Sequence, residues 1–150
     1  MIEQTIGISE QLVDIFENIM KMEHEFVIRE SKKNLSMTEI HTIAAIGIEE
    51  LGTMSEIAEK LHITVGTLTV AVNNLVKKDY AERYKSEKDR RIVKIGLTRQ
   101  GKEIYRIHEG FHRDLVAKLL KNITEPAEME GVRKALTNLA EFIGQTYQDE

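Results

Sequence analysis

The chain has 150 residues, of which 41% are hydrophobic and none is cysteine, and its formal net charge is −4. The hydrophobic content suffices for a folded core and excludes a mainly disordered chain, while the absence of cysteine excludes a disulfide framework. No apolar run approaches the roughly 20 residues of a membrane span, and the first residues lack the pattern of a secretory signal. We therefore expect one folded chain located in the cytoplasm.

The first predicted element is a long amphipathic helix from Ile8 to about Arg29. The residues of its stripe lie three or four positions apart, and they are Leu12, Ile15, Phe16, Ile19, Met22, Glu23 and Phe26. A polar break at residues 31–34 follows. Ser36 and Glu39 then have the spacing of a capping box, which predicts the start of a second helix. Its buried stripe is expected to contain Met37, Ile40, Ile43 and Ala44.

A helix-turn-helix is predicted next. Thr53 and Glu56 again have capping-box spacing, residues 62–63 form the turn, and the Thr64 hydroxyl can cap a second helix. Residues 67–72 alternate as they would in a strand, because several of them are β-branched. The helical pattern continues beyond them, however, so we interpret the whole segment from Thr64 as a helix.

On a helical wheel, this second helix has an apolar side and a small, polar side. The apolar side contains Val65, Leu68, Val72, Leu75 and Val76. The opposite side contains Gly66, Thr67, Val70, Asn73, Asn74 and Lys77. Hydroxyl and amide groups can bond base edges or phosphates, and a valine can contact a thymine methyl group. The polar side therefore suits the major groove of DNA.

A β-hairpin, the wing, is predicted from strands at Ala81–Lys85 and Arg91–Leu97, joined by a turn at residues 86–90. Its tip carries four cations that can reach phosphates or a narrow minor groove, namely Lys85, Lys88, Arg90 and Arg91. Residues 60–102 contain 11 Lys or Arg and 4 Asp or Glu residues, a net charge of +7, whereas the remainder of the chain carries −11. A basic module in an acidic chain indicates DNA binding.

Two further helices are predicted after the wing. Thr98 can cap the first of them, whose apolar face contains Ile104, Ile107, His108, Phe111, Leu115 and Leu119. The last helix is expected to start at Thr124 with Pro126 in its first turn. Its apolar positions are Met129, Val132, Leu136, Leu139 and Ile143. The helices at both ends of the chain exceed what a small winged domain needs for its core, so they can form a separate layer.

Several stretches carry a resemblance to a known family. Asp89-Arg90-Arg91, residues 94–98 and Gly101 resemble the wing-and-exit signature of the MarR family of bacterial regulators. Within that family, the chain resembles the repressors of fatty-acid synthesis genes in streptococci and their relatives. The further shared stretches are residues 39–43, 66–67, 73–75 and 86–87 and the pair His108 and His112. The resemblance extends from about Leu35 to Leu139.

The resemblance implies a mainly α winged helix-turn-helix fold of about six helices and a two-stranded β-wing. Residues 35–98 would form the DNA-binding region, and residues 1–34 and 99–150 would form helices that interlock in a homodimer. The partner would be double-stranded DNA with a palindromic, A·T-rich operator. The candidate DNA-binding residues are Ser55, Thr64, Gly66, Thr67, Thr69, Val70, Asn73, Lys77, Lys85, Ser86, Lys88, Asp89, Arg90 and Arg91.

The resemblance also implies an effector, a long acyl chain on acyl carrier protein that acts as co-repressor. Residues that could line an acyl pocket are Ile19, Phe26, His41, Ile104, His108 and Phe111. Cations that could face the acidic carrier are Arg99, Lys102, Arg106 and Arg113. Ordinary core packing and an ordinary solvated helix face would give the same two patterns. No cofactor is expected to be required.

The histidines leave an alternative open. A zinc-sensing branch of the same family uses a first-helix carboxylate and histidines from about these places, which here are His41, His108 and His112. In the other interpretation, His108 is a core histidine with a backbone partner and His41 is a polar link between helices. Phosphate-binding glycine loops, nucleophile elbows and HExxH motifs are absent from the sequence, so we do not expect an enzyme.

Overall fold

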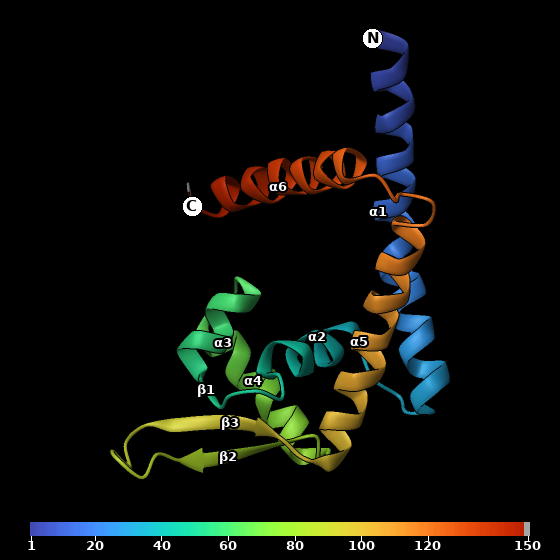
Figure 1. The fold of residues 1–150 in the computed structure, drawn as a ribbon. Coiled ribbons are helices and arrows are strands. Elements are labelled where there is room, and N and C mark those ends of the chain that lie inside the picture. The colour runs from blue at the N-terminus through green and yellow to red at the C-terminus, as the bar shows by residue number, and fades with distance from the viewer. Residues whose placement is uncertain (149–150) are drawn as a thin grey trace. The chain divides into compact units, whose positions relative to one another are not determined.

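The computed structural model describes the backbone of residues 1–148 and the side chains of residues 1–145. Its elements, drawn in Figure 1, are α1 (Ile2–Ser31), α2 (Met37–Ile46), β1 (Gly52–Thr53), α3 (Met54–Leu61), α4 (Val65–Lys77), β2 (Ala81–Lys85), β3 (Val93–Leu97), α5 (Arg99–Leu119) and α6 (Pro126–Gln148). The chain divides into two compact units, one of residues 1–111 and one that begins at His112. This mainly α architecture of six helices and a small sheet confirms the predicted fold class. None of the described helices has the length and apolar character needed to cross a membrane.

The helix starts follow from side-chain caps. Both predicted capping boxes are present: the Glu39 N–H donates to Ser36 Oγ at 3.2 Å, and the Glu56 N–H donates to Thr53 Oγ1 at 3.3 Å. The Thr64 hydroxyl oxygen accepts from the backbone of Thr67 at 3.2 Å, which caps α4. The ambiguous segment 67–72 is therefore helical, because a cap and buried neighbours outweigh the strand preference of its β-branched residues.

The core of the first unit joins α2, α3, α4 and the sheet. The side chains with no exposed surface in these elements are Ile40, Ile43, Ile57, Leu68, Val72, Leu75 and Ile95. From α1, only Glu23 and Val27 are buried. Of the predicted apolar side of α4, Val65 is an exception, because it lies in the first turn and is 44% exposed. Ala71, which was not predicted on this side, is buried together with Leu68 and Leu75.

The sheet is antiparallel with strand order β1-β3-β2, so it contains one strand more than the predicted two-stranded wing. Gly52 pairs with Ile95, and β2 pairs with β3 from Ala81 opposite Leu97 to Lys85 opposite Val93. The strand β3 starts at Val93 rather than at the predicted Arg91. The reason is that the Ile92 N–H donates to the Asp89 carbonyl at 3.0 Å and closes the turn at the wing tip.

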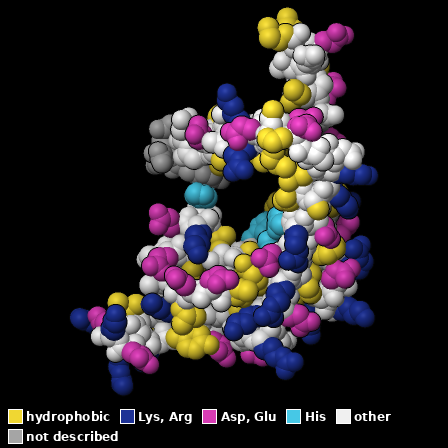
Figure 2. Space-filling view, in the orientation of Figure 1, with side chains coloured by type: hydrophobic (Ala, Val, Ile, Leu, Met, Phe, Trp, Pro, Cys, Tyr) yellow, Lys and Arg dark blue, Asp and Glu magenta, His cyan; other side chains and the backbone are white. Residues whose placement is uncertain are grey.

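The helices at the two ends of the chain begin at other residues than the sequence predicted. The helix α1 begins at Ile2 rather than Ile8, and α6 begins at Pro126 rather than at Thr124. In α6, the Met129 N–H bonds the carbonyl of Glu125 at 3.1 Å, which puts Pro126 in the first turn as expected. Along the first half of α1, large apolar side chains remain exposed, as Figure 2 shows at the upper right. They include Ile8, Val13, Ile15 and Phe16.

Candidate DNA-binding surface and effector site

The polar side of α4 faces outward because the opposite, apolar side packs in the core. Leu68, Val72 and Leu75 are fully buried, and this fixes the rotation of the helix about its axis. The residues that the sequence places on the other side are all exposed, namely Gly66, Thr67, Val70, Asn73, Asn74 and Lys77. Of the remaining candidates, Ser55 in α3 and Thr64 and Thr69 are exposed as well. An α-helix presented in this way has the dimensions to enter a major groove.

The threonine hydroxyls at the start of α4 are partly used within the helix. Thr64 Oγ1 and Thr67 Oγ1 share a hydrogen bond of 3.0 Å, and the Thr69 hydroxyl donates to the Val65 carbonyl at 2.8 Å. A hydroxyl that donates its proton within its own helix keeps its lone pairs. Thr69 can therefore accept a hydrogen bond from the amino group of a base, but it has no further proton to donate. The geometry thus limits what this end of α4 can read.

A contact between the wing and α4 was not predicted from the sequence. The Arg83 guanidinium of β2 donates from Nη2 to Oδ1 of Asn73, and both residues are exposed. The missed signal was the position of Arg83 in the wing strand: the strand follows α4 after one short turn, so a long cationic side chain on it can reach back to the exposed side of that helix. Asn73 is therefore held by a neighbour rather than free to rotate.

The wing tip presents exposed cations, and Figure 2 shows Lys and Arg side chains there at the lower left. Asp89 accepts from the Arg91 backbone N–H at 3.0 Å and from Arg91 Nε at 3.2 Å. These bonds from Arg91 hold the pKa of the Asp89 carboxyl below its usual value. Lys85, Lys88, Arg90 and Arg91 are exposed, whereas Ser86 is half-buried and donates its N–H to the Ile92 carbonyl at 2.9 Å.

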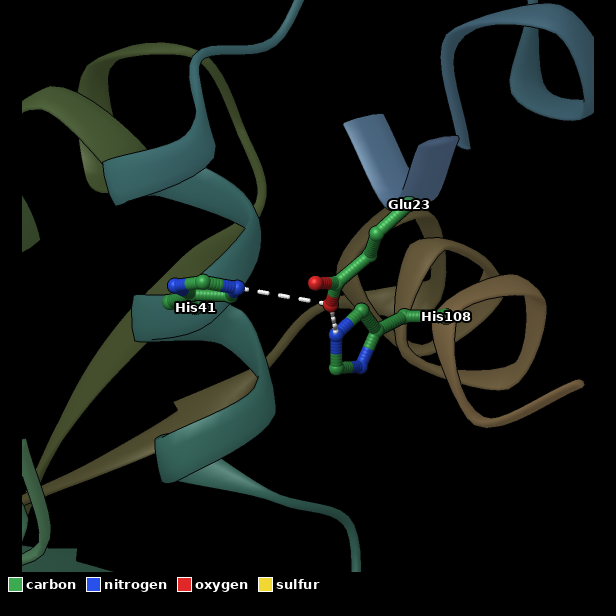
Figure 3. Close-up of side chains that lie close together, drawn as sticks. All are labelled: Glu23, His41 and His108. Carbon is green, nitrogen blue, oxygen red and sulfur yellow. Dashed lines mark hydrogen bonds and ion pairs between the residues drawn. The ribbon is translucent and has the colours of Figure 1, made fainter. Parts of the chain in front are cut away.

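A buried carboxylate connects three helices of the first unit. Glu23 of α1 accepts hydrogen bonds at Oε1 from Nε2 of His41 in α2, at 3.3 Å, and from Nε2 of His108 in α5 (Figure 3). Glu23 is 3% exposed and His108 is 9% exposed. Burial pushes the pKa of Glu23 upward, but the bonds and charges of the two histidines outweigh it and lower that pKa below its usual value. We call these three residues the Glu23 cluster.

The geometry of the Glu23 cluster is compatible with both interpretations of the histidines, as polar links in the core and as metal ligands. His41 is a polar link between helices, as the sequence interpretation allowed, and His108 is a buried histidine that donates to the Glu23 carboxylate. The three side chains each offer one ligand atom, and these atoms lie within 4.8 Å of one another. This donor set of two imidazoles and one carboxylate fits zinc. His112, the third predicted histidine ligand, belongs to the second unit.

The predicted acyl-pocket residues other than the two histidines lie on α1 and α5, the helices that carry Glu23 and His108. Ile104 and Phe111 are buried, and Ile19 and Phe26 are half-buried. The rings of Phe26 and Phe111 are 5.5 Å apart between centroids, and the Arg29 guanidinium lies 5.4 Å from the Phe26 ring centroid. The predicted carrier-facing cations Arg99, Lys102 and Arg106 are exposed along the first part of α5, and Arg113 is exposed in the second unit.

Four similarities to known proteins are relevant. A family model described as MarR matches residues 35–93. The crystal structure of Streptococcus pneumoniae FabT in complex with DNA is 38% identical to this chain, with a TM-score of 0.81, over 95% of this chain and 99% of that one. The regulator SarZ of Staphylococcus aureus is 38% identical over 71 residues, which are 47% of this chain and 48% of SarZ.

The regulator YhjH of Bacillus subtilis, a protein described as uncharacterized, is 28% identical over 100 residues, which are 67% of this chain and 57% of YhjH. The chain thus spans about half the length of the curated relatives it matches. The similarity to the DNA-bound FabT structure, by contrast, covers nearly the full length of both chains.

Proposed function

The chain belongs to the MarR family of winged-helix DNA-binding transcriptional regulators, and from this premise we propose that it represses genes of fatty-acid synthesis. Members of this family are regulators rather than enzymes, which confirms that the chain is not an enzyme. The observation that carries the proposal is the similarity to the DNA-bound FabT structure, at 38% identity over 95% of the chain. The sequence resemblance to fatty-acid repressors of streptococci points to the same class of target gene.

We propose that residues 35–98 form a DNA-binding head. The exposed side of α4 would enter the major groove, and the wing tip would contact phosphates and the minor groove. Support comes from the exposed polar side of α4 and from the cations at the wing tip, which include Lys88, Arg90 and Arg91. In this arrangement Asp89 would steady Arg91 while the guanidinium lies in a narrow groove, where the negative potential is greatest.

We propose that the active form is a two-fold homodimer assembled by the terminal helices. The first half of α1 exposes Ile15 and Phe16, and α6 exposes Leu136. Exposed apolar side chains that recur along a helix face indicate an interface. A two-fold dimer requires a palindromic operator with half-sites about one DNA turn apart or a multiple of it. Nuclease protection of one half-site only, by a protein that is monomeric in light scattering, would refute this assembly.

The proposed co-repressor is a long-chain acyl group on acyl carrier protein. The supporting features are the buried and half-buried apolar residues of α1 and α5 and the exposed cations of α5, since the carrier is acidic. Arg99→Glu or Arg106→Glu should weaken the effect of the acylated carrier while DNA binding without carrier changes less. Lys33→Glu, an exposed charge reversal in the segment after α1, is the matched control and should leave the carrier effect intact.

A divalent metal is the second candidate effector, and the observation that favours it is the convergence of Glu23, His41 and His108. The two effectors make opposite predictions. If zinc acts here, His41→Ala should abolish the effect of metal on DNA binding, and a chelator should mimic that variant. If an acyl chain acts here, a bulky replacement such as Ile19→Trp should block the effect of the acylated carrier, and a chelator should change nothing.

A further inference from the structure

The contact between Arg83 and Asn73 fixes the orientation of a side chain at the DNA-facing surface. The guanidinium of Arg83 has only N–H donors, so the atom of the Asn73 amide that faces it must be the oxygen Oδ1. The amide nitrogen of Asn73 therefore points away from Arg83. Amide orientation is often ambiguous between oxygen and nitrogen, but a partner that can only donate removes the ambiguity.

This orientation limits the bases that Asn73 can read. An asparagine that pairs with adenine in the major groove uses both of its ends: Oδ1 accepts from the N6 amino group, and the amide nitrogen donates to N7. Here Oδ1 already accepts from a cation. Its second lone pair is open, but the positive charge of Arg83 opposes the approach of another N–H donor such as the adenine N6 or cytosine N4 amino group.

What the pair offers outward is a set of N–H donors, from the amide of Asn73 and from the remaining nitrogens of Arg83. Guanine presents two acceptors in the major groove, N7 and O6, and thymine presents O4. Both residues are exposed, and Asn73 lies on the same side of α4 as Val70 and Lys77, the side that faces away from the core. The N–H donors on this side of α4 can therefore bind a base edge that presents hydrogen-bond acceptors.

We propose that Arg83 is a positioning residue for base recognition, which holds Asn73 so that α4 selects guanine or thymine acceptors and disfavours adenine at one base pair of each half-site. The inference rests on the proposed function, because it requires that α4 enters the major groove. It assigns to the wing strand β2 a part in base selection as well as in phosphate contact.

The experiment measures binding of the full-length protein to an operator series in which each base pair of a half-site is replaced in turn by the other three. Asn73→Ala should abolish the preference at one base pair. Arg83→Ala should change the preference at that same base pair, by about fivefold or more, with a gain for adenine because Asn73 can then pair with it at both ends. Arg83→Lys, which cannot reproduce the planar guanidinium, should give an intermediate result.

Lys85→Ala is the matched control, because Lys85 is a second exposed cation on the same strand and side, two residues further along β2. Its loss should weaken binding to every sequence equally and reduce the salt dependence. If Arg83→Ala gives the same uniform loss, or leaves every base preference unchanged, the inference is wrong while the proposed function survives. If the unaltered protein shows no base preference at all, the proposed function is wrong, and the inference falls with it.

Discussion

The head and the helical ends of this chain differ in how completely they bury their apolar side chains. In the head, Ile57 and Leu68 have no exposed surface, and both capping boxes are formed. In the first half of α1, Phe16 is 54% exposed, and no described side chain of α6 is buried. The apolar side chains at the centre of the head are therefore already buried within one chain. The helical ends have the surface of elements that become buried when two chains associate, which is the basis of the proposed dimer.

The largest expected effect tests the head. Leu68→Ala removes a fully buried side chain from α4 and should lower the free energy of unfolding by about 2–5 kcal/mol. The matched control is Val70→Ala, which truncates a residue of the same helix that is 62% exposed and should change stability by less than about 0.5 kcal/mol. Denaturant titration of both variants measures this. Similar losses for the two would contradict the assignment of the inward and outward sides of α4.

The second-largest expected effect concerns the proposed dimer interface at the helical ends of the chain. Phe16→Glu places a charge on the exposed apolar face of α1 and should weaken dimerisation by about tenfold or more, because buried aromatic residues dominate interface energies. Sedimentation velocity over a range of protein concentrations measures the dissociation constant. Glu17→Ala, an exposed neighbour in the same helix, is the control and should have little effect. An unchanged dimer in Phe16→Glu would remove the first half of α1 from the interface.

The third effect separates two kinds of cation within the wing tip. Arg91→Ala should lose affinity mainly on operators with A·T-rich flanks, by about 1–2 kcal/mol, because a narrow minor groove attracts a guanidinium. Lys88→Ala and Arg90→Ala should act through phosphates and reduce the slope of log affinity against log salt concentration by about 0.9 each. Equal losses for Arg91→Ala on A·T-rich and G·C-rich flanks would show that it too contacts only phosphate.

The smallest effect concerns an ion pair inside the head. Lys78 of the segment after α4 lies 2.5 Å from the Glu39 carboxylate of α2. Burial raises the pKa of Glu39, but the Lys78 ammonium and the Ser36 N–H outweigh it, so the pKa is lowered below its ordinary 4.5. A lowered pKa in the folded state means that this contribution is complete above the ordinary pKa and is lost as the pH falls through the folded-state pKa.

We expect this contribution to be about 0.5–1 kcal/mol, because Lys78 is partly exposed and solvent screens the pair. The measurement is the free energy of unfolding from neutral to acidic pH, for the unaltered protein and for Lys78→Met. The difference between them should shrink as Glu39 becomes protonated. A difference that stays constant with pH would show that the ion pair does not contribute through the charge of Glu39.

Local signals account for what the sequence predicted well. The capping boxes at Ser36 and Thr53 and the strand Ala81–Lys85 depend on residues a few positions apart, and all three are present as predicted. The outward side of α4 could be predicted because helical periodicity alone separates it from the core side. The roles of these residues in DNA binding stay predictions until the variants above are measured.

The features that sequence analysis missed depend on contacts between distant segments. The strand β1 has two residues and exists only because β3 pairs with it. Glu23 and His108 are 85 positions apart, so no local pattern indicates that one carboxylate joins them and His41. The bond from Arg83 to Asn73 likewise depends on the way the wing turns back toward α4. Tertiary packing determines each of these contacts.

Our principal proposal is that an acyl carrier controls DNA binding by this regulator. The most direct test is the affinity of the purified protein for a DNA fragment that carries its operator, measured with no carrier, with unacylated carrier and with long-chain acylated carrier. We expect the acylated carrier alone to tighten binding about fivefold or more, and DNA to tighten carrier binding by the same factor. Unchanged DNA affinity with the acylated carrier, together with at least about fivefold tightening by zinc at micromolar concentration, would contradict the claim.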